Sequence, residues 1–353
     1  MNEPEYRNIA IIKLSALGDI IHAIPAFNIL RKQFPRAKIS WFVEPVGAKL
    51  LKNVEGIDEI VVCNLKIKGF FNKYKEVKRL RSLYRKQFDL IIDFQGLLKS
   101  AILAWLLDGS SLGFDKENLK EPQAGYFYKK RAGFFDENRH VVFKNIHLIR
   151  EPVSLNPGPA DTHTQDHDYA VEYPLKSITL SERLERFLAE NKLEKDNYLI
   201  LNVGAGWESK MLGSDQYIDI INKIKSKYKV VILWGNEKER IIAEEISRQT
   251  RVLVSLLFDF SELTLFIEYS RLIVTADTLA LHIADMVKKV SIGIFGPTSP
   301  WRNGSLLKES VSIYEKLPCG FCYKKKCGTI ECIKKINIEK IVESIETSYE
   351  KCS

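Results

Sequence analysis

The chain has 353 residues, of which 45% are hydrophobic and 28% are charged, and its formal net charge is +8. This length exceeds one ordinary core and fits two domains, and the composition is typical of a globular protein. No apolar run is long enough to span a bilayer, and the first residues lack the features of a secretory signal. We therefore expect a cytoplasmic protein whose membrane contact is peripheral. Positive charge favours an acidic partner, but the chain has no zinc-finger spacing and no RNP-like run, which argues against nucleic acid.

Short aliphatic runs alternate with amphipathic stretches, a pattern that predicts βαβ units and parallel sheets. A turn at Ser15–Asp19 follows the first strand and leads into a helix in which Pro25 suits the first turn. Leu97–Leu107 predicts another helix. In the first half, the predicted strands are Ile9–Lys13, Ile39–Val43, Ile60–Val62 and Leu90–Asp93.

The stretch from Lys73 to Arg81 predicts a helix with one strongly cationic side. Two interpretations stay open. A solvated helix face is favoured over a surface that docks on a membrane.

The second half repeats the alternation. Its predicted strands are Tyr198–Val203, Val230–Trp234, Val252–Ser255, Leu272–Thr275 and Ser291–Phe295. Between the halves, residues 157–163 are rich in turn formers and indicate a loop near a domain boundary. We predict domains at 1–165 and 166–335, followed by a closing region at 336–353. Its helix, about Ile338–Tyr349, opens after the N-cap residue Asn337 and is expected to pack back toward the first domain.

Ligands of doubly wound sheets bind at the carboxyl ends of the strands, so polar residues there are the first candidates. Gly18 permits a tight turn after the first strand, with backbone amides that can face a ligand. Asp19 is either the N-cap of the next helix or a general base that takes a proton from a sugar hydroxyl. His22, one turn on, is either a second polar group of the site or an ordinary residue on the helix face.

The loops after the later strands suit a phosphorylated ligand. Two interpretations of Asp277 and Thr278 are open. They can simply cap the helix that follows, or the free backbone amides at the start of this helix can bind a diphosphate. The loop Phe295–Pro300 can complete that pocket. The glycines before Lys210 suit an anion-binding loop, in which the lysine offsets charge on a leaving phosphate. A carboxylate within Gly235–Glu239 can accept hydrogen bonds from ribose hydroxyls.

Six motifs occur in the order found in one enzyme family. They are KLSALGDIIHAIPA, DFQGLLKSA, the loop around Lys210, WGNEKE, ADTLALHIA and FGPTSP. With these motifs the chain, from about Ile9 to Thr298, resembles the ADP-heptose glycosyltransferases of family 9. Ser15–His22 and Asp93–Ser100 look most like the lipopolysaccharide heptosyltransferase I subfamily. The resemblance implies an α/β GT-B fold, in which two Rossmann-like doubly wound domains face a central cleft and the donor binds mainly to the second.

The resemblance also implies an activity. It is the inverting transfer of heptose from ADP-L-glycero-D-manno-heptose to the first Kdo of Kdo-lipid A, in biosynthesis of the lipopolysaccharide inner core. The enzyme would work on the inner face of the inner membrane, with no cofactor and no metal ion. Asp19 matches the catalytic base of the family.

On the donor side, Lys210 matches the lysine on the donor phosphate, Glu239 the acid on the ribose, and Asp277 the residue that holds the heptose. The other expected donor-binding residues are Thr278, Leu279, Ala280, His282, Gly296, Pro297 and Thr298. The expected acceptor-binding residues are Ser15, Gly18, His22, Gln95, Gly96, Lys99 and Glu121, with Pro122 beside the last.

The chain departs from the family pattern in two loops. Lys210 is usually followed by an aromatic residue and a proline, but residues 211–213 here are Met-Leu-Gly, and Gly206 replaces a common hydroxyl residue. Backbone amides are therefore expected to take over contacts in that loop. After Thr278, the sequence Leu-Ala-Leu alters packing more than chemistry.

Four cysteines cluster near the C-terminus. Without a secretory signal, a disulfide framework is not expected. Structural or redox-sensitive thiols are favoured over a zinc clip, because the spacings are not those of a standard zinc ribbon. None of these four cysteines follows a predicted strand, so a catalytic role is the least favoured. The four are Cys319, Cys322, Cys327 and Cys332.

Four alternatives remain at this stage. The chain can be another family 9 transferase, such as heptosyltransferase II or an enzyme that acts on a capsule or a glycoprotein. It can be a sugar-nucleotide epimerase of the same fold, or a non-catalytic nucleotide-sugar-binding protein. A nucleic-acid-binding protein is the weakest alternative, since only net charge supports it.

Overall fold

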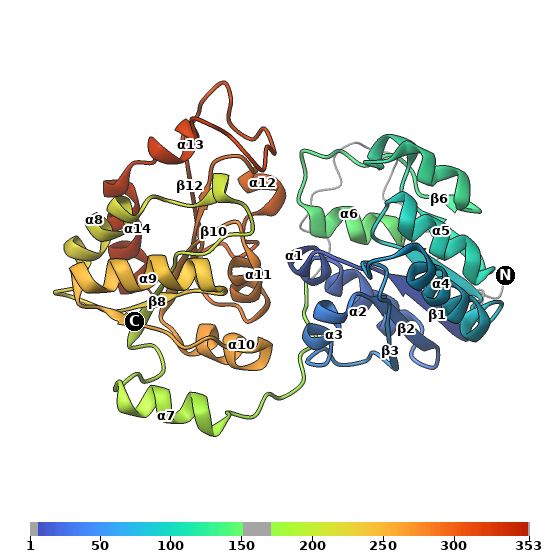
Figure 1. Cartoon of the computed structure of the whole chain (residues 1–353), viewed down its shortest axis with the longest axis horizontal. Helices are drawn as coiled ribbons and strands as arrows, with labels where there is room; N and C mark the ends of the chain where they lie inside the picture. Colours follow the sequence, from blue (N-terminus) through green and yellow to red (C-terminus); the bar gives the residue numbers. More distant parts are fainter. Residues whose placement is uncertain (1–5, 151–170, 352–353) are drawn as a thin grey trace. The chain divides into compact units, whose positions relative to one another are not determined.

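The computed structural model describes residues 6–150 and 171–351 (Figure 1). The chain divides into two compact units, 1–177 and 178–353. The predicted loop at 157–163 and the predicted boundary after residue 165 lie outside the described residues. The units themselves divide between Ser177 and Ile178.

Unit 1 is built on a parallel sheet with the strand order β3-β2-β1-β4-β5-β6. Helix α4 packs beside α5 in this unit, and α2 packs beside α6. The strands are β1 (Asn8–Ile12), β2 (Lys38–Val43), β3 (Glu59–Val62), β4 (Leu90–Asp93), β5 (Ser110–Gly113) and β6 (Lys130–Arg131). The helices are α1 (Leu17–Ile21), α2 (Ile24–Gln33), α3 (Pro45–Leu51), α4 (Phe70–Tyr84), α5 (Leu98–Leu107), η1 (Lys116–Asn118), η2 (Pro122–Phe127) and α6 (Val141–Leu148).

Unit 2 is built in the same way, with the order β12-β11-β10-β7-β8-β9 and parallel pairing throughout. The strands are β7 (Tyr198–Asn202), β8 (Lys229–Leu233), β9 (Leu253–Val254), β10 (Leu272–Ala276), β11 (Ser291–Phe295) and β12 (Val311–Tyr314). The helices are α7 (Glu182–Glu190), η4 (Glu208–Lys210), α8 (Ser214–Ile224), α9 (Glu237–Thr250), α10 (Phe260–Tyr269), α11 (Leu279–Met286), α12 (Pro300–Asn303), α13 (Glu331–Lys334) and α14 (Ile338–Lys351).

Each sheet reverses its strand order at one point. In unit 1 the reversal lies between the neighbouring strands β1 and β4, and in unit 2 it lies between β7 and β10. This arrangement is that of the doubly wound Rossmann-type sheet, whose ligands bind at the carboxyl ends of the strands beside the reversal. The topology therefore marks one edge in each unit as the place to look for a site.

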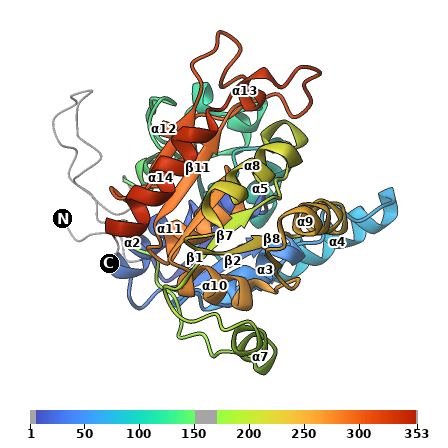
Figure 2. The same cartoon turned by 90° about the vertical axis from the view of Figure 1, so that its left-hand side faces the viewer.

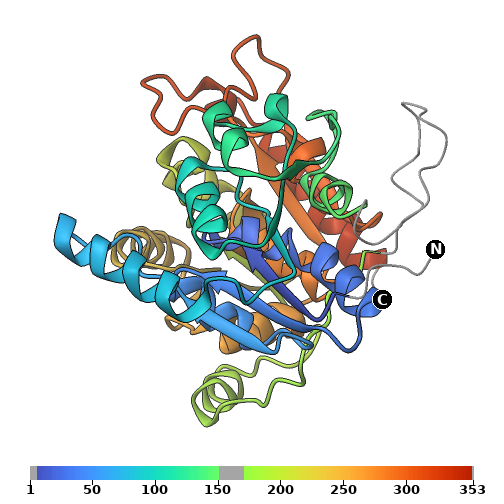
Figure 3. The same ribbon diagram turned by 90° about the vertical axis from the view of Figure 1, so that its right-hand side faces the viewer.

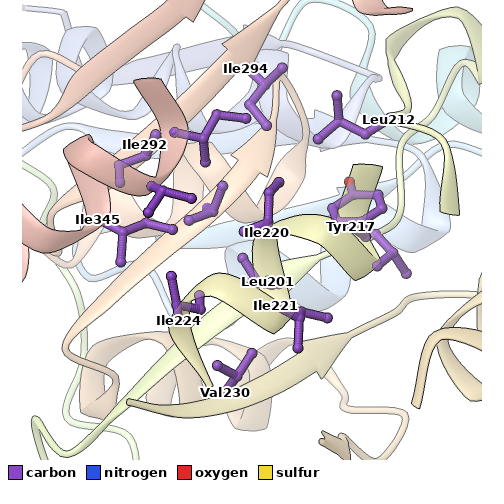
Figure 4. Close-up of a cluster of buried hydrophobic side chains, with 14 of the residues drawn as sticks. Leu201, Leu212, Tyr217, Ile220, Ile221, Ile224, Val230, Ile292, Ile294 and Ile345 are labelled. Atoms are coloured by element: carbon purple, nitrogen blue, oxygen red, sulfur yellow. The ribbon is translucent and has the colours of Figure 1, made fainter. Parts of the chain in front are cut away.

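One cluster of the core of unit 2 lies between its sheet and the helices α8, α9 and α14, and part of it is drawn in Figure 4. Ile220, Ile221 and Ile224 of α8 point toward Leu201 and Val230 of the sheet and are fully or almost fully buried. Their spacing places them on one face of the helix, which explains why this segment folds as an amphipathic helix.

The closing helix α14 packs on the core of unit 2. Ile341, Val342 and Ile345 are buried in the core of this unit, where α14 lies against α8, β11 and β12 (Figure 2). Asn337 accepts a hydrogen bond from the backbone N–H of Glu339, as expected of an N-cap residue. The apolar face of the helix is therefore used inside its own unit.

The sequence missed three strands and overestimated one. β5 has the sequence Ser-Ser-Leu-Gly, and the two residues of β6 are both exposed, so neither has an aliphatic run. β12 was missed as well. The predicted strand Val252–Ser255 is reduced to two residues in β9. Among the described helices, none combines the length and apolarity needed to cross a bilayer.

Candidate functional site

The first edge, at the carboxyl ends of β1 and β4, is held together by Gln95. Its Oε1 atom accepts hydrogen bonds from the backbone N–H groups of Leu14 and Ser15, both at 3.0 Å. The turn that carries Gln95 is fixed in turn by Asp93, which accepts from the N–H groups of Gln95 at 2.8 Å and Gly96 at 3.2 Å. The structure therefore brings together three predicted residues, Ser15, Gln95 and Gly96.

Asp93 lies at the end of β4 and is fully buried. The hydroxyl of Tyr128 donates to its Oδ2 atom at 2.7 Å. Burial raises the pKa of Asp93, and the hydrogen bonds from Tyr128, Ser100 and the turn amides oppose that rise. Burial and the neighbouring Asp93 carboxyl also raise the pKa of Tyr128. The pair of Asp93 and Tyr128 thus holds the turn that carries Gln95 in place. Neither residue was predicted from the sequence to have a role.

Asp19 is the third residue of α1, not its N-cap as one interpretation had it. The N-cap is Ala16, whose backbone N–H donates to the Oδ2 atom of Asp19 at 3.3 Å. The carboxylate is partly exposed. It therefore lies in the first helical turn after β1, where the positive end of the helix favours negative charge.

Lys99 projects from the first turn of α5 and pairs with Glu44 at the end of β2, at an N–O distance of 3.1 Å. Lys66 pairs with the other oxygen of the same carboxylate at 2.6 Å. The Glu44 side chain is only 8% exposed. Two lysines on one carboxylate leave a net positive charge near the first edge, which suits an anionic ligand. Neither Glu44 nor Lys66 was predicted.

Two predicted residues of unit 1 serve the structure in other ways. The Oε2 atom of Glu121 accepts from the backbone N–H of Leu98 at 2.6 Å and so caps the start of α5. His22 is buried, and its ring packs edge-on against that of His140, with centroids 5.6 Å apart. The structure thus brings His22 together with α6.

The second edge, at the carboxyl ends of β7 and β10, is centred on Asp277. The ammonium of Lys210 lies 2.8 Å from its Oδ2 atom and 2.9 Å from its carbonyl oxygen. His282 Nε2 lies 3.3 Å from its Oδ1 atom, and Asn303 donates to Oδ2 at 3.1 Å. Burial disfavours ionisation of Asp277, but the hydrogen bond from His282 and the charge of Lys210 hold its pKa well below the usual range.

The loop of Lys210 is further held by an aromatic ring. The ammonium lies 4.3 Å from the centroid of the Trp207 ring, a favourable cation–π distance. Trp207 and Asn303 were not predicted as site residues. Trp207 lies within the loop that was predicted to bind an anion, so the sequence could have identified it. Asn303 reaches the site from α12, outside the predicted loops.

Asn202, the last residue of β7, connects the same loops. Its side-chain amide donates to the carbonyl of Gly204 at 3.1 Å, to Thr275 Oγ1 at 2.9 Å and to Thr278 Oγ1 at 3.3 Å. Thr278 is the N-cap of α11, so the helix begins at Leu279 and the amides of its first turn have no partner within the helix. The predicted residues Leu279 and Ala280 supply two of those amides.

Glu239 lies in the first turn of α9, and its side chain lies against Gly204 in the loop after β7 and Gly235 in the loop after β8. Its Oε2 atom accepts from the N–H of Gly235 at 2.8 Å. A Cβ atom at Gly204 would lie 2.1 Å from the same oxygen, so any larger residue there would displace the carboxylate. The carboxylate is thereby placed between the ends of β7 and β8.

The loop after β11 supplies buried hydroxyl groups. Thr298 and Ser299 are 1% and 4% exposed, and within the described part of the chain their hydroxyls have no hydrogen-bond partner. Buried polar groups are normally satisfied, so an unpaired pair at a strand end indicates a place for a ligand. Gly296 and Pro297 precede them, and their carbonyls accept from the N–H groups of Phe321 at 3.0 Å and Tyr323 at 2.7 Å.

The cysteine-containing segment therefore supports the loop after β11. Cys319, Cys322 and Cys327 are exposed free thiols and Cys332 is a buried one. In the described residues, no three His, Cys, Asp or Glu side chains are grouped so as to hold a metal ion. The segment contacts Gly296 and Pro297 through the backbone hydrogen bonds of Phe321 and Tyr323.

The chain is similar to known proteins both in sequence and in structure. A family model described as glycosyltransferase family 9 (heptosyltransferase) matches residues 77–332. Lipopolysaccharide heptosyltransferase 1 of Campylobacter coli is 30% identical over 303 residues, which cover 84% of this chain and 85% of that protein. Lipooligosaccharide heptosyltransferase 2 of Campylobacter jejuni is 23% identical over 345 residues, which cover 93% of each.

Two solved structures illustrate the shared fold. A family 9 glycosyl transferase from Veillonella parvula has a TM-score of 0.78 at 18% identity and covers 99% of both chains. The E. coli heptosyltransferase WaaC, solved with ADP-2-deoxy-2-fluoro heptose, has a TM-score of 0.71 at 19% identity and covers 98% of this chain and all of that one. At these identities the likeness concerns the fold, and it confirms the predicted α/β GT-B class.

Proposed function

Because this chain belongs to glycosyltransferase family 9, the heptosyltransferases, we propose that it transfers heptose from ADP-L-glycero-D-manno-heptose to the first Kdo of Kdo-lipid A. The transfer inverts the anomeric carbon and belongs to lipopolysaccharide inner-core biosynthesis on the cytoplasmic face of the inner membrane. The observation that carries the proposal is the buried cluster of Lys210, Asp277 and His282 where the second sheet reverses its strand order.

The donor diphosphate is assigned to the second edge. The ammonium group of Lys210 has three N–H donors. Two of them bind the carboxylate and the carbonyl oxygen of Asp277, so the third can bind a phosphate oxygen. The first-turn amides of α11 and the positive end of its dipole add further donors. The hydroxyls of Thr298 and Ser299 gain partners when a phosphate is bound.

The ribose of the nucleoside and the heptose are assigned to two carboxylates, Glu239 and Asp277. Glu239 suits the ribose, because its remaining lone pairs can accept from the two ribose hydroxyls. Asp277 suits the heptose, since its lowered pKa keeps it an acceptor for sugar hydroxyls at any ordinary pH. Gly296 and Pro297 keep the loop after β11 in position around the diphosphate.

Asp19 is assigned as the general base. The oxygen of a Kdo hydroxyl attacks the anomeric carbon, its proton passes to the Asp19 carboxylate, and the bond from that carbon to the β-phosphate oxygen breaks with its electron pair leaving on ADP. Lys210 and the α11 amides stabilise that charge as it develops. The attack comes from the face opposite the departing ADP, which is why the configuration inverts.

The acceptor is assigned to the first edge, where Ser15, Gly18, Gln95 and Gly96 line the turn beside Asp19. The net positive charge of Lys66 and Lys99 on Glu44 suits the carboxylate of a Kdo sugar. Glu121 contributes through the cap that it forms on α5.

One assay tests the proposal. The purified chain is incubated with ADP-heptose and Kdo-lipid A, and ADP release and product mass are measured together. We expect one ADP per heptosylated Kdo-lipid A. ADP release without a product of higher mass would indicate donor hydrolysis only, and an altered sugar nucleotide formed without acceptor would indicate an epimerase; either result would refute the proposal.

The second candidate is heptosyltransferase II, because relatives of that name match over 93% of this chain at lower identity. The same assay with heptosylated core in place of Kdo-lipid A separates the two. Preference for heptosylated core would keep the donor assignments and replace the acceptor.

A further inference from the structure

The positive charge of this chain is concentrated in one short segment. Residues 65–86 contain nine lysine or arginine residues and one acidic residue, Glu76, an excess of eight positive charges. Since the formal net charge of the whole chain is also +8, the rest of the chain has no net formal charge. The nine cations are Lys66, Lys68, Lys73, Lys75, Lys78, Arg79, Arg81, Arg85 and Lys86.

Helix α4 displays much of this charge on an open surface. Among the side chains of α4 that the structure describes, Leu80 is the buried one, whereas Phe71 is 77% exposed and Tyr74 is 57% exposed. Helical periodicity places Phe71, Tyr74, Lys75, Lys78 and Arg81 on the side of the helix that faces away from Leu80. We call these five residues the α4 face.

The positively charged side chains of the α4 face are not paired with carboxylates in the part of the chain that the structure describes. In the described residues, Lys75, Lys78 and Arg81 form no salt bridge. By contrast, Arg79 is paired with Glu76 and Arg85 with Asp108. The only acidic residue of the helix is therefore already occupied on another side.

Neighbouring elements carry further exposed apolar side chains. Helix α5 packs beside α4, and Figure 3 shows the two helices side by side in unit 1. It adds Trp105, 60% exposed, and Leu98, 37% exposed. Element η2 packs on α5 and adds Tyr126, 80% exposed. Large exposed apolar side chains therefore occur on three elements that pack in sequence, α4, α5 and η2.

We propose that the α4 face docks this chain on an anionic lipid surface. Aromatic side chains partition to the boundary between headgroups and acyl chains, and lysine and arginine are attracted to anionic headgroups. The aliphatic Leu98 can contact acyl chains and has no stacking role on nucleic acid. The proposal rests on the proposed function, because a lipid-linked acceptor is reached only at such a surface.

Docking is tested with the full chain and sedimented vesicles. Vesicles of phosphatidylcholine alone are compared with vesicles that also contain phosphatidylglycerol, at low and high salt. We expect binding that requires the anionic lipid and weakens with salt. The triple variant Lys75→Glu, Lys78→Glu, Arg81→Glu should bind at least about tenfold more weakly, and the double variant Phe71→Ser, Tyr74→Ser should also lose binding.

Matched controls separate the α4 face from net charge and from loss of one apolar group. The triple variant Lys195→Glu, Arg248→Glu, Lys308→Glu makes the same charge change at exposed positions of unit 2. Ile241→Ser removes a 56% exposed apolar side chain from α9. Both controls should bind like the wild type. Equal loss in the control triple, no binding by the wild type, or preference for an oligonucleotide over vesicles would each overturn the proposal.

The activity assay distinguishes this proposal from the proposed function. The α4 variants should transfer heptose normally to a fully deacylated, water-soluble acceptor and poorly to the same acceptor with its lipid embedded in vesicles. Equal transfer to both acceptors by the α4 variants would refute docking and leave the proposed function intact. Vesicle binding without any transfer by the wild type would refute the proposed function and leave docking intact.

Discussion

The ammonium of Lys210 and the Oδ2 atom of Asp277 lie 2.8 Å apart, although 67 residues separate them in the sequence. The two side chains are 12% and 3% exposed. The pair joins the loop after β7 to the loop after β10, so the two loops that flank the strand reversal behave as one unit. Removing either partner leaves the other charge buried without its counter-charge, which is costly.

The first prediction concerns Lys210→Ala. His282 and Asn303 continue to stabilise Asp277 in this variant, so we expect the free energy of unfolding to fall by about 2–4 kcal/mol. The value of kcat/KM for ADP-heptose should fall at least about 100-fold, because the departing phosphate loses its cation. Urea unfolding and steady-state kinetics measure the two effects. The exposed control Lys195→Ala should change neither, and unaltered donor kinetics in Lys210→Ala would remove the lysine from the phosphate site.

The second prediction is a dependence of stability on pH. The pKa of Asp277 is lowered in the folded chain, so its contribution is fully present above the ordinary aspartate pKa of about 3.9 and is lost as pH falls toward the lowered value. The difference in free energy of unfolding between wild type and Asp277→Asn should therefore be largest near neutral pH and shrink below about pH 4. Urea unfolding at several pH values measures it. A constant difference would show that the ionised form is not stabilised.

The third prediction concerns the base. Asp19→Asn keeps the size of the side chain and an oxygen that can accept from Ala16, but it removes the proton acceptor. We expect kcat to fall by about 10²–10⁴ with Kd for ADP unchanged within a factor of about two. Calorimetric titration with ADP measures the second quantity. Near-normal turnover by this variant would exclude Asp19 as the base.

The strand ends could be predicted because strands buried on both faces read as continuous aliphatic runs. The bounds of β4 and β11 agree with the sequence prediction residue by residue. Asp277 was singled out because it follows such a run, and Glu239 lies in a loop singled out for the same reason. Gln95 was named from the resemblance to the family. Asn202 is itself the last residue of a strand, and the same rule could have found it.

The remaining contacts depend on tertiary packing that one sequence does not reveal. Asn303 reaches Asp277 from 26 residues away, and Tyr128 reaches Asp93 from 35 residues away, each from an element with no chemical signature of its own. The closing helix shows the same limit. The sequence shows the apolar face of α14, but it does not show that this face packs on the core of unit 2.

The fourth prediction concerns Tyr128→Phe. The substitution removes the hydrogen bond to the buried Asp93 carboxyl and leaves the ring, so the free energy of unfolding should fall by about 1–3 kcal/mol. Because Asp93 holds the turn of Gln95, which in turn holds Ser15, we expect kcat to fall while KM for ADP-heptose stays unchanged. Steady-state kinetics with each substrate varied measures the split. A change confined to the KM of the donor would contradict this positioning role.

The last prediction compares two glycines of one loop. At Gly204 a Cβ atom would lie 2.1 Å from the Oε2 atom of Glu239, whereas at Gly206 it would meet nothing within 4 Å. Gly204→Ala must therefore push the Glu239 carboxylate away from its hydrogen bond with Gly235, and we expect ADP to bind at least about tenfold more weakly, because a positioned carboxylate on the ribose is lost. Gly206→Ala is the matched control and should bind ADP like the wild type. Titration calorimetry with ADP measures both, and equal affinities in the two variants would show that Glu239 does not contribute to nucleotide binding.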